Sequence, residues 1–426
     1  MRSRRRIRTL LVVAALGGAA CNAIVGVETV ALGPGKSDAG SDAEAPGEDA
    51  DPTPSDGSTP PSGPLAVKVA LGYIHTCARR LDGTVLCWGE NGAGQVGDGI
   101  PFDGSRPEVT IPQRVVNIRD ATEVAAGISH TCALRKTGGV SCWGLNFFGQ
   151  LGDGTKTRTS TPVDVTGLGD ATFIVAGTSF TCAVRRDETA VCWGANYAGQ
   201  LGDDTKDDKS TPVPVKQLSE VLAMAAAEYH ACALSRGGTV RCWGRNDDGQ
   251  LGIGSLTESL TPRAVASLND VVAIAAASRF SCALRSSGLV YCWGANDRGQ
   301  LGTGSASPSP NPSPVLVTGI TNAKAIWAGY DHACAALETG KVVCWGAAGR
   351  GQLGTGSPGI PLDASVPRPS EVVGMTGAVT VVTGGEHTCA TTIAGGIFCW
   401  GSNGLGELGN GTKQGAFSAV PVTGFP

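Results

Sequence analysis

The chain has 426 residues and a net charge of -4, with 16% charged residues, 63 glycines and 24 prolines. A slightly acidic chain without a basic stripe is a poor partner for nucleic acid. The glycine and proline content argues against long helices and favours many short strands joined by tight turns.

The first 21 residues have the pattern of an export signal. They contain five arginines, then an apolar run from Leu10 to Leu16, then small residues. Such a segment is too short to span a membrane as a mature helix. Cys21 stands where a bacterial lipoprotein signal has its lipidated cysteine, although Gly18 replaces the usual leucine or valine. We expect export, with lipidation of Cys21 as the first interpretation and cleavage with secretion as the alternative.

Residues 22–64 are expected to form a disordered tether that is rich in acids, proline, serine and glycine. Positions 33–64 hold seven acids, one lysine and almost no large apolar side chain. A segment of this composition cannot bury enough apolar surface to fold, and its charges repel one another. The tether would therefore link a lipid anchor in the membrane to the remainder of the chain.

A unit of about fifty residues recurs seven times and fills residues 65–426. Each unit has two cysteines ten positions apart, and Trp-Gly follows the second cysteine. The pairs are Cys77 and Cys87, Cys132 and Cys142, Cys182 and Cys192, Cys232 and Cys242, Cys282 and Cys292, Cys334 and Cys344, and Cys389 and Cys399. This period is typical of repeat architectures, in which each unit buries its apolar face against its neighbours. No room remains for a separate catalytic domain.

The cysteines of each unit are predicted to form a disulfide across a hairpin. Folding the hairpin about its midpoint, at Asp82 in the first unit and Thr137 in the second, places the two cysteines directly opposite each other. Opposed strand residues approach closely enough for a disulfide, and an exported location favours oxidation. Structural zinc is the weaker alternative, because zinc ligands cluster more tightly than these isolated couples.

Neither the histidines nor the glycine-rich tail of the unit predicts a metal or a cofactor. All the histidines, His75, His130, His230, His332 and His387, stand two positions before the first cysteine of a unit. Phe180 and Phe280 take that position in the other two units, which indicates a packing role. The tail WGxNxxGQLGxG follows a strand and precedes no helix pattern, so its glycines indicate turns and not a dinucleotide site.

Each unit supplies four strand-like segments, for example TEVAAG, TCALR, GVSCWG and STPVDV in the second unit. The segment before the histidine consists of very small residues, as expected where wedge-shaped sheets converge on an axis. The fold class is therefore all-β, a seven-bladed β-propeller of four-stranded blades, and we expect a monomer. Residue 65 onward begins directly with the innermost strand, AVKVALG, without a preceding PVxV segment, and the chain ends with AVPVTGFP, a PVxV segment without a blade of its own. We expect the final segment to complete the first blade and close the ring.

The repeated pattern HTCAL…GxVxCWGxNxxGQLGxGT…P resembles the repeat of the regulator of chromosome condensation family. Family members are seven-bladed propellers, and the founding member is a guanine-nucleotide exchange factor for a nuclear GTPase. The resemblance covers residues 65–426 and implies the fold. It implies activity only weakly, because an export signal separates this chain from a nuclear GTPase, and no stretch here matches the founder's exchange residues. Some secreted bacterial members of the same propeller class are protein inhibitors.

Consecutive antiparallel strands alternate in direction, so the loop before the histidine and the loop after Cys-Trp-Gly open on one side. This side carries Tyr73, Phe147, Phe148, Tyr197, Tyr229, Arg279, Arg298, Tyr330 and Arg350. Aromatic and arginine side chains on variable loops are typical of protein-binding hot spots, although they can also be ordinary surface residues. The leading hypothesis is an extracytoplasmic, membrane-anchored binding or scaffold protein, and not an enzyme. Its partner would be a protein or a polysaccharide of the cell envelope.

Two alternatives assign an activity to the same propeller. An enzyme acting on surface glycans could use the carboxylates Glu228, Asp247, Asp248 and Asp297, which lie on the same side. Acidic loop residues are usually only solvated, however. The second alternative is nucleotide exchange by analogy with the founding family member, which the expected location disfavours.

Overall fold

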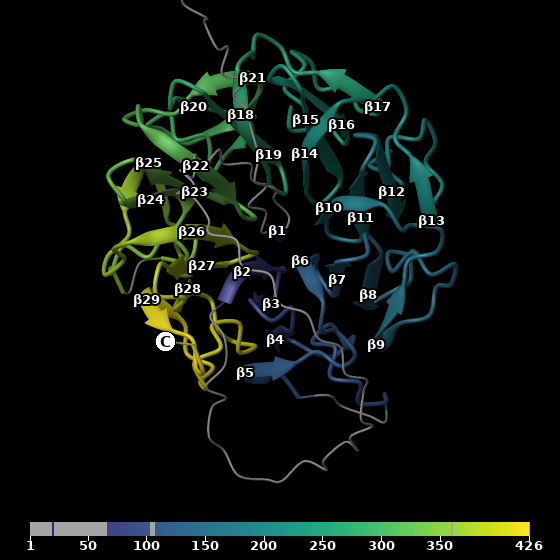
Figure 1. The fold of residues 1–426 in the computed structure, drawn as a ribbon. Helices are drawn as coiled ribbons and strands as arrows, with labels where there is room; N and C mark the ends of the chain where they lie inside the picture. Colours follow the sequence, from purple (N-terminus) through teal and green to yellow (C-terminus); the bar gives the residue numbers. More distant parts are fainter. Residues whose placement is uncertain (1–18, 21–65, 103–106, 359–360, 426) are drawn as a thin grey trace, which may run out of the picture.

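The computed structural model describes residues 19–20, 66–102, 107–358 and 361–425, and within them every regular element is a β-strand. Seven antiparallel sheets stand around a central axis (Figure 1). The prediction of an all-β propeller with seven four-stranded blades is confirmed. The expected signal, with Cys21, and the expected tether lie outside the described residues, apart from Ala19 and Ala20. No helix long and apolar enough to cross a membrane occurs in the described ranges.

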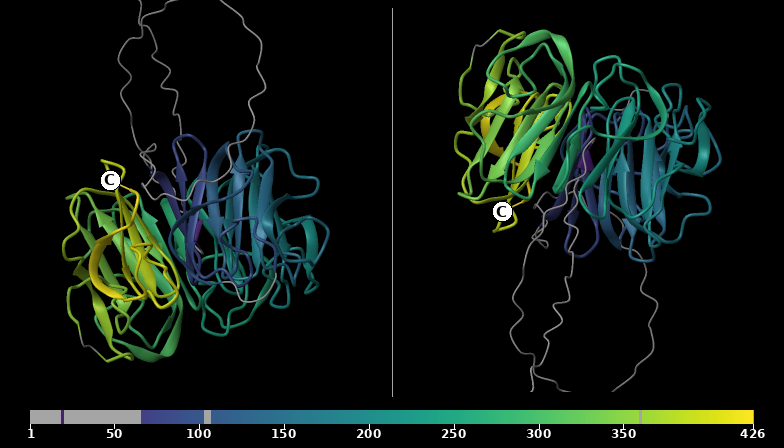
Figure 2. Two further views of the ribbon diagram at one scale, coloured as in Figure 1. Left: turned by 90° about the horizontal axis from the view of Figure 1, so that it is seen from below. Right: turned by 90° about the horizontal axis from the view of Figure 1, so that it is seen from above.

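The sheet order follows the chain in every blade, from the strand at the axis to the strand at the rim (Figure 1). Figure 2 shows the same ring of sheets from the side. Blade 1 consists of β2 (Ala66–Leu71), β3 (His75–Arg80), β4 (Val85–Gly89) and β5 (Val109–Arg114). Blade 2 consists of β6 (Ala121–Ala126), β7 (His130–Arg135), β8 (Val140–Gly144) and β9 (Thr159–Asp164). Blades 3 and 4 are β10 (Ala171–Ala176), β11 (Phe180–Arg185), β12 (Ala190–Gly194), β13 (Lys209–Pro214), and β14 (Val221–Ala226), β15 (His230–Ser235), β16 (Thr239–Gly244), β17 (Ser259–Ala264).

Blades 5 and 6 are β18 (Val271–Ala276), β19 (Phe280–Arg285), β20 (Val290–Asn296), β21 (Ser307–Leu316), and β22 (Ala323–Ala328), β23 (His332–Leu337), β24 (Val342–Ala347), β25 (Ser365–Glu371). Blade 7 is β26 (Ala378–Thr383), β27 (His387–Thr392), β28 (Ile397–Gly401), β29 (Ala416–Pro421). A two-residue strand, β1 (Ala19–Ala20), pairs in parallel with β6 at Ala125 and Ala126.

Each hairpin of second and third strands is closed by the predicted disulfide. The cysteines face each other in the strand register of all seven blades, as Cys77 faces Cys87 in blade 1. Their Cα atoms lie 4.0 to 4.1 Å apart. By the loop-entropy argument a short closed loop contributes roughly 2 kcal/mol to stability. Seven intramolecular disulfides are typical of proteins that reside in an oxidising compartment.

Neighbouring blades are joined by the tryptophan that follows the second cysteine. In blade 2, Trp143 is fully buried, and its indole Nε1 donates a 2.9 Å hydrogen bond to the carbonyl of Gln95 in blade 1. Gly97, at φ +75°, lies against this ring, where an added Cβ would come within 2.6 Å of Nε1. The glycine of the GQxG tail is therefore required both for its backbone conformation and for room beside the indole. The other blade pairs repeat this contact.

The prediction that the final segment of the chain completes the first blade is wrong. The final strand β29 pairs with β28 of its own blade, with Phe398 opposite Pro421. Blade 1 has its own outer strand β5, whose sequence VTIPQR keeps the proline of the PVxV segment but not the valine that follows. The seam between blades 7 and 1 is closed by side chains instead. Trp88 donates a 2.8 Å hydrogen bond to the carbonyl of Glu407, and the ring of Phe425 lies 6.3 Å from the Trp88 ring.

Deleting Ser418–Pro426 is expected to lower the melting temperature by about 10 °C or more. The deletion removes four of the six residues of β29, the buried Val422 and the contact of Phe425 with Trp88, which together contribute several kcal/mol of apolar burial. Deleting residues 22–64 in a matched variant should change the melting temperature by no more than about 1 °C, because a segment of this composition is not expected to bury apolar surface. Differential scanning calorimetry of both variants tests this expectation, and equal shifts would contradict it.

Candidate binding face

The loops between first and second strands and the loops between third and fourth strands open on one side, which we call the loop face. The first set is short and meets at the axis: residues 72–74, 127–129, 177–179, 227–229, 277–279, 329–331 and 384–386. The second set is longer and lies further out. We call the opposite side, with the hairpin turns such as residues 136–139, the hairpin face.

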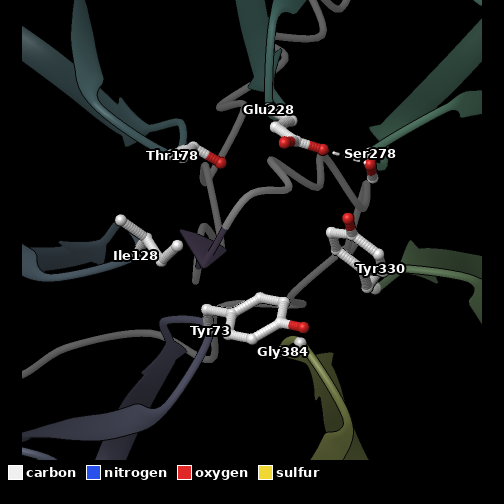
Figure 3. Close-up of a pocket in the computed structure, with 9 residues that line it drawn as sticks. Tyr73, Ile128, Thr178, Glu228, Ser278, Tyr330 and Gly384 are labelled. Atoms are coloured by element: carbon white, nitrogen blue, oxygen red, sulfur yellow. Dashed lines mark hydrogen bonds between the residues drawn. The ribbon is translucent and has the colours of Figure 1, made fainter.

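The short loops form a shallow pocket on the axis, with about 320 Å³ of empty space open to solvent (Figure 3). Every blade contributes to its wall, through Tyr73, Ile128, Thr178, Glu228, Ser278, Gly329, Tyr330, Gly384 and Gly385. Sequence reasoning selected only the tyrosines and Glu228 from this set. The others occupy the first two positions of the same short loops, so alignment of the seven units could have identified them.

Two pairs of predicted tyrosines are in contact. The rings of Tyr73 and Tyr330 lie 5.3 Å apart in an edge-to-face arrangement at the pocket. The close approach of Tyr73 depends on Gly385, because a Cβ there would lie 2.6 Å from the Tyr73 carbonyl oxygen and 2.7 Å from its ring. Further out, Tyr197 and Tyr229 lie 5.2 Å apart. Arg245, which sequence reasoning missed, places its guanidinium 5.5 Å from the Tyr229 ring.

The remaining predicted residues are distributed around the loop face. Phe147 is 61% exposed at the tip of the blade 2 loop, and Phe148 beside it is partly buried. Arg298 donates to the carbonyl of Asp363 at 3.0 Å, and Arg350 lies 3.4 Å from Glu386. The structure therefore does not gather all nine predicted residues into one patch.

Arg279 is the centre of a charged cluster between blades 4, 5 and 6. Its guanidinium donates to both oxygens of Asp297, at 2.7 and 2.9 Å. It also lies 3.8 Å from Asp248 and 3.6 Å from Asp331. Burial raises the pKa of both the Asp248 and the Asp331 carboxyl groups, whereas their attraction to Arg279 lowers it. For Asp297, the bonds from Arg279 prevail and hold the pKa of the carboxyl below its usual range.

The four carboxylates of the glycan-enzyme alternative occupy different environments. Asp248 and Asp297 bind Arg279, and Asp247 accepts a 2.8 Å hydrogen bond from Arg245. Only Glu228 lines the axial pocket, where it accepts a hydrogen bond from the hydroxyl of Ser278. The structure therefore does not place the four carboxylates together around one cavity.

Burial and acidic neighbours make the pocket a poor place for a phenolate. Burial, together with repulsion from Glu386, Asp331 and Glu228, raises the pKa of Tyr73 to about 12. Burial and Glu228 likewise raise the pKa of Tyr330. Both phenols therefore stay protonated at neutral pH.

The histidines lie in the blade interfaces and not on the loop face. All five are fully buried, and burial lowers the pKa of each to about 3. His75 illustrates the contact, since its Nε2 lies 2.9 Å from the hydroxyl of Thr131 in the next blade. That hydroxyl donates to the Gln95 carbonyl at 2.9 Å, so Nε2 must carry the proton and donate to it. No group of three or more metal-ligating side chains occurs within the described part of the chain.

Family models of the regulator of chromosome condensation (RCC1) repeat match most of the ring. One matches residues 82–134, 137–184, 192–234, 237–284, 287–336 and 339–391, and a second matches six further segments between residues 66 and 352. The first repeat of the first model runs from β4 and β5 of blade 1 into β6 and β7 of blade 2. The repeats of this model are therefore offset from the blades.

Curated relatives share only short segments with the chain. A probable E3 ubiquitin-protein ligase HERC4 of Rattus norvegicus is 40% identical over 88 residues, which is 20% of this chain and 8% of the relative. A secretion-regulating guanine nucleotide exchange factor of Bos taurus is 36% identical over 114 residues, 24% of each chain. The chain thus matches less than a quarter of the length of either relative.

Solved structures share the fold over a much larger part of the chain. Prp20p of Saccharomyces cerevisiae, described together with its binding to Gsp1p and histones, superposes with a TM-score of 0.71 at 21% identity. The match covers 82% of this chain and 88% of Prp20p. Human WBSCR16 gives a TM-score of 0.69 at 20% identity, over 80% of this chain and 94% of its own. At these identities the likeness concerns the fold alone.

Proposed function

The chain belongs to the regulator of chromosome condensation (RCC1) repeat family, and we propose that it is an extracytoplasmic binding propeller that engages a protein partner through its loop face. In this proposal the chain is a scaffold and not an enzyme. Repeat propellers commonly present variable loops on a rigid ring, so that recognition depends on loop residues and stability on the blades.

The observation that supports the proposal most is a row of aromatic side chains across blades 2, 3 and 4. Phe147 is 61% exposed and Tyr197 is 51% exposed, each at the tip of its long loop. Tyr229 packs on Tyr197 at 5.2 Å, and Arg245 lies over Tyr229. We call these four residues the aromatic sector. Aromatic rings beside an arginine are the composition of protein-binding hot spots, and exposed rings of this size carry a cost in water that a partner would remove.

The proposed location rests on the disulfides and on the amino-terminal sequence. Seven buried disulfides would be reduced slowly or not formed in a cytosol that keeps thiols reduced. In this proposal the expected export signal provides the route, and Cys21 provides the lipid anchor in the cell envelope. Nucleotide exchange, the activity of the bovine relative, is disfavoured by the same location, because its nucleotide-bound partner would be intracellular.

Substituting Phe147, Tyr197 and Tyr229 together with alanine is expected to reduce capture of the partner from envelope extracts by at least about tenfold. The three side chains would supply the central apolar contacts, each contributing about 1 kcal/mol or more. Capture is measured by affinity pull-down with the full chain, followed by mass spectrometry and glycan staining.

A matched control replaces three exposed apolar residues outside the loop face, Leu81, Val379 and Ile393, with alanine. This control should retain capture. If the aromatic variant retains its melting temperature and captures as much as the unchanged chain, the aromatic sector is not the binding surface. If capture survives protease treatment of the extract but not glycan digestion, the partner is a polysaccharide and the proposal of a protein partner is wrong.

A further inference from the structure

The axial pocket of the loop face has an uncompensated carboxylate beside two aromatic rings. Glu228 accepts one hydrogen bond, from the neutral Ser278 hydroxyl, and the described residues give it no ion pair. The other carboxylates of the short loops are paired, Asp331 with Arg279 and Glu386 with Arg350. Glu228 is therefore the one carboxylate of the short loops whose charge the surrounding chain does not neutralise.

The other walls of the pocket suit an organic cation. Tyr73 and Tyr330 both line the pocket, and their edge-to-face contact at 5.3 Å leaves them at an angle of 81° to each other (Figure 3). Two rings set nearly at right angles form a corner, and aromatic faces attract cations. Burial is the main cause of the raised pKa of both phenols, and repulsion from Glu228 adds to it, so the negative potential of Glu228 extends to the corner.

We propose that the axial pocket binds an alkylammonium group, with Glu228 as the counter-charge and Tyr73 and Tyr330 as the aromatic walls. The pocket is shallow and open to solvent, which suits a single ammonium head and its adjoining carbons. The source is a lysine side chain of the protein partner, and this source rests on the proposed function.

Calorimetric titration of the full chain at low ionic strength tests the pocket without any partner. The probes are choline, Nα-acetyl-lysine-methylamide and the neutral choline isostere 3,3-dimethylbutanol. Both cations are expected to bind with dissociation constants in the millimolar range, and the neutral isostere at least about tenfold more weakly, as cation–π and ionic attraction require. Equal heats from choline and its isostere would overturn the proposal.

Three substitutions locate the site. Glu228→Gln and Tyr73→Leu should each weaken cation binding by about tenfold. Asp247→Asn, which removes an exposed carboxylate paired with Arg245 outside the pocket, should leave it unchanged. Each variant is first shown to keep the parental melting temperature. If a variant does not keep the parental melting temperature, Glu228→Asp is measured in its place. Cation binding that is retained by Glu228→Asp, which keeps a carboxylate at this position, supports the assignment. Unchanged binding by Glu228→Gln would contradict it.

The probes also separate this inference from the proposed function. Lysine amide binding more tightly than choline supports a protein side chain as the source, whereas the reverse order identifies a quaternary ammonium ligand and contradicts the lysine assignment. If the aromatic-sector variant still captures the partner, the proposed binding face is refuted, but the cation titration remains valid. Failure of the titration with intact capture would refute only the pocket.

Discussion

Replacing Thr131 with alanine is expected to lower the free energy of unfolding by about 2 kcal/mol. The change leaves the buried Nε2–H of His75 without an acceptor, and an unpaired buried donor costs about 1 to 3 kcal/mol. Replacing His75 with phenylalanine alone is also expected to destabilise, because the longer ring presses on the Thr131 side chain. The double variant His75→Phe/Thr131→Ala should recover much of the loss. Urea unfolding of the parent, the two single variants and the double variant measures the coupling free energy between the two substitutions.

The structure provides the reason for expecting recovery. Histidine faces a hydroxyl in the next blade at five interfaces: His75 with Thr131, His130 with Thr181, His230 with Ser281, His332 with Thr388 and His387 with Thr76. At the other two interfaces Phe180 and Phe280 are followed in the next blade by Ala231 and Ala333. Two blade interfaces of this chain therefore already combine phenylalanine with alanine where the other five combine histidine with a hydroxyl. Additive effects of the two substitutions would contradict the pairing.

Acidification from pH 7 to pH 5 is expected to destabilise the ring by about 2 kcal/mol for each buried histidine. Burial lowers the histidine pKa from 6.5 to about 3 in the folded chain. Between these values the unfolded chain binds protons that the folded chain does not, so stability falls as the pH falls through 6.5 and continues to fall toward 3. Urea unfolding at the two pH values, with the disulfides intact, measures the change.

The variant His75→Phe/Thr131→Ala is the matched comparison for this expectation, because it removes one titrating histidine and leaves every carboxylate in place. Its loss of stability between pH 7 and pH 5 should be smaller than that of the parent by about 2 kcal/mol. An equal loss in both chains would show that the His75 imidazole is already protonated, or solvated, in the folded state.

The fold was predictable because its signals recur in every unit. The spacing of Cys132 and Cys142 fixes the hairpin register, and the small residues of TEVAAG identify the strand at the axis. Ring closure was predicted wrongly, because the absence of a PVxV segment before residue 65 indicated that the first blade lacks an outer strand of its own. That outer strand is β5, which follows the long loop of the same unit. In all seven units the segment that follows the long loop forms the outer strand and pairs with the third strand of its own blade.

The blade-interface pairs were present in the sequence but were not recognised. Histidine was compared with phenylalanine at one position of the unit, whereas the informative comparison is with the next residue of the following unit. His387 pairs with Thr76 across the seam. The pairing of each histidine with a hydroxyl of the following unit therefore also places blade 7 next to blade 1 in the ring. A pairing between positions about fifty residues apart can be found only when the units are aligned and the ring is assumed to close.

The candidate site was predictable only in part. The strand alternation placed Tyr73, Tyr197, Tyr229 and Tyr330 on one face, but their pairing depends on distances between blades that a single repeat does not contain. The same holds for Arg279, whose partners come from three blades. The sequence also gave no means of distinguishing Glu228, which lacks a cationic partner, from the paired acids nearby.

Hydrogen–deuterium exchange of the full chain with and without its captured partner tests the proposed use of the loop face most directly. We expect protection of the short loops at 227–229 and 329–331 and of the long loops that carry Phe147 and Tyr197, with unchanged exchange at the hairpin turns such as 136–139. Protection confined to the hairpin turns or to the outer strands would contradict the account, because the partner would then bind a surface that the aromatic sector and the axial pocket do not reach.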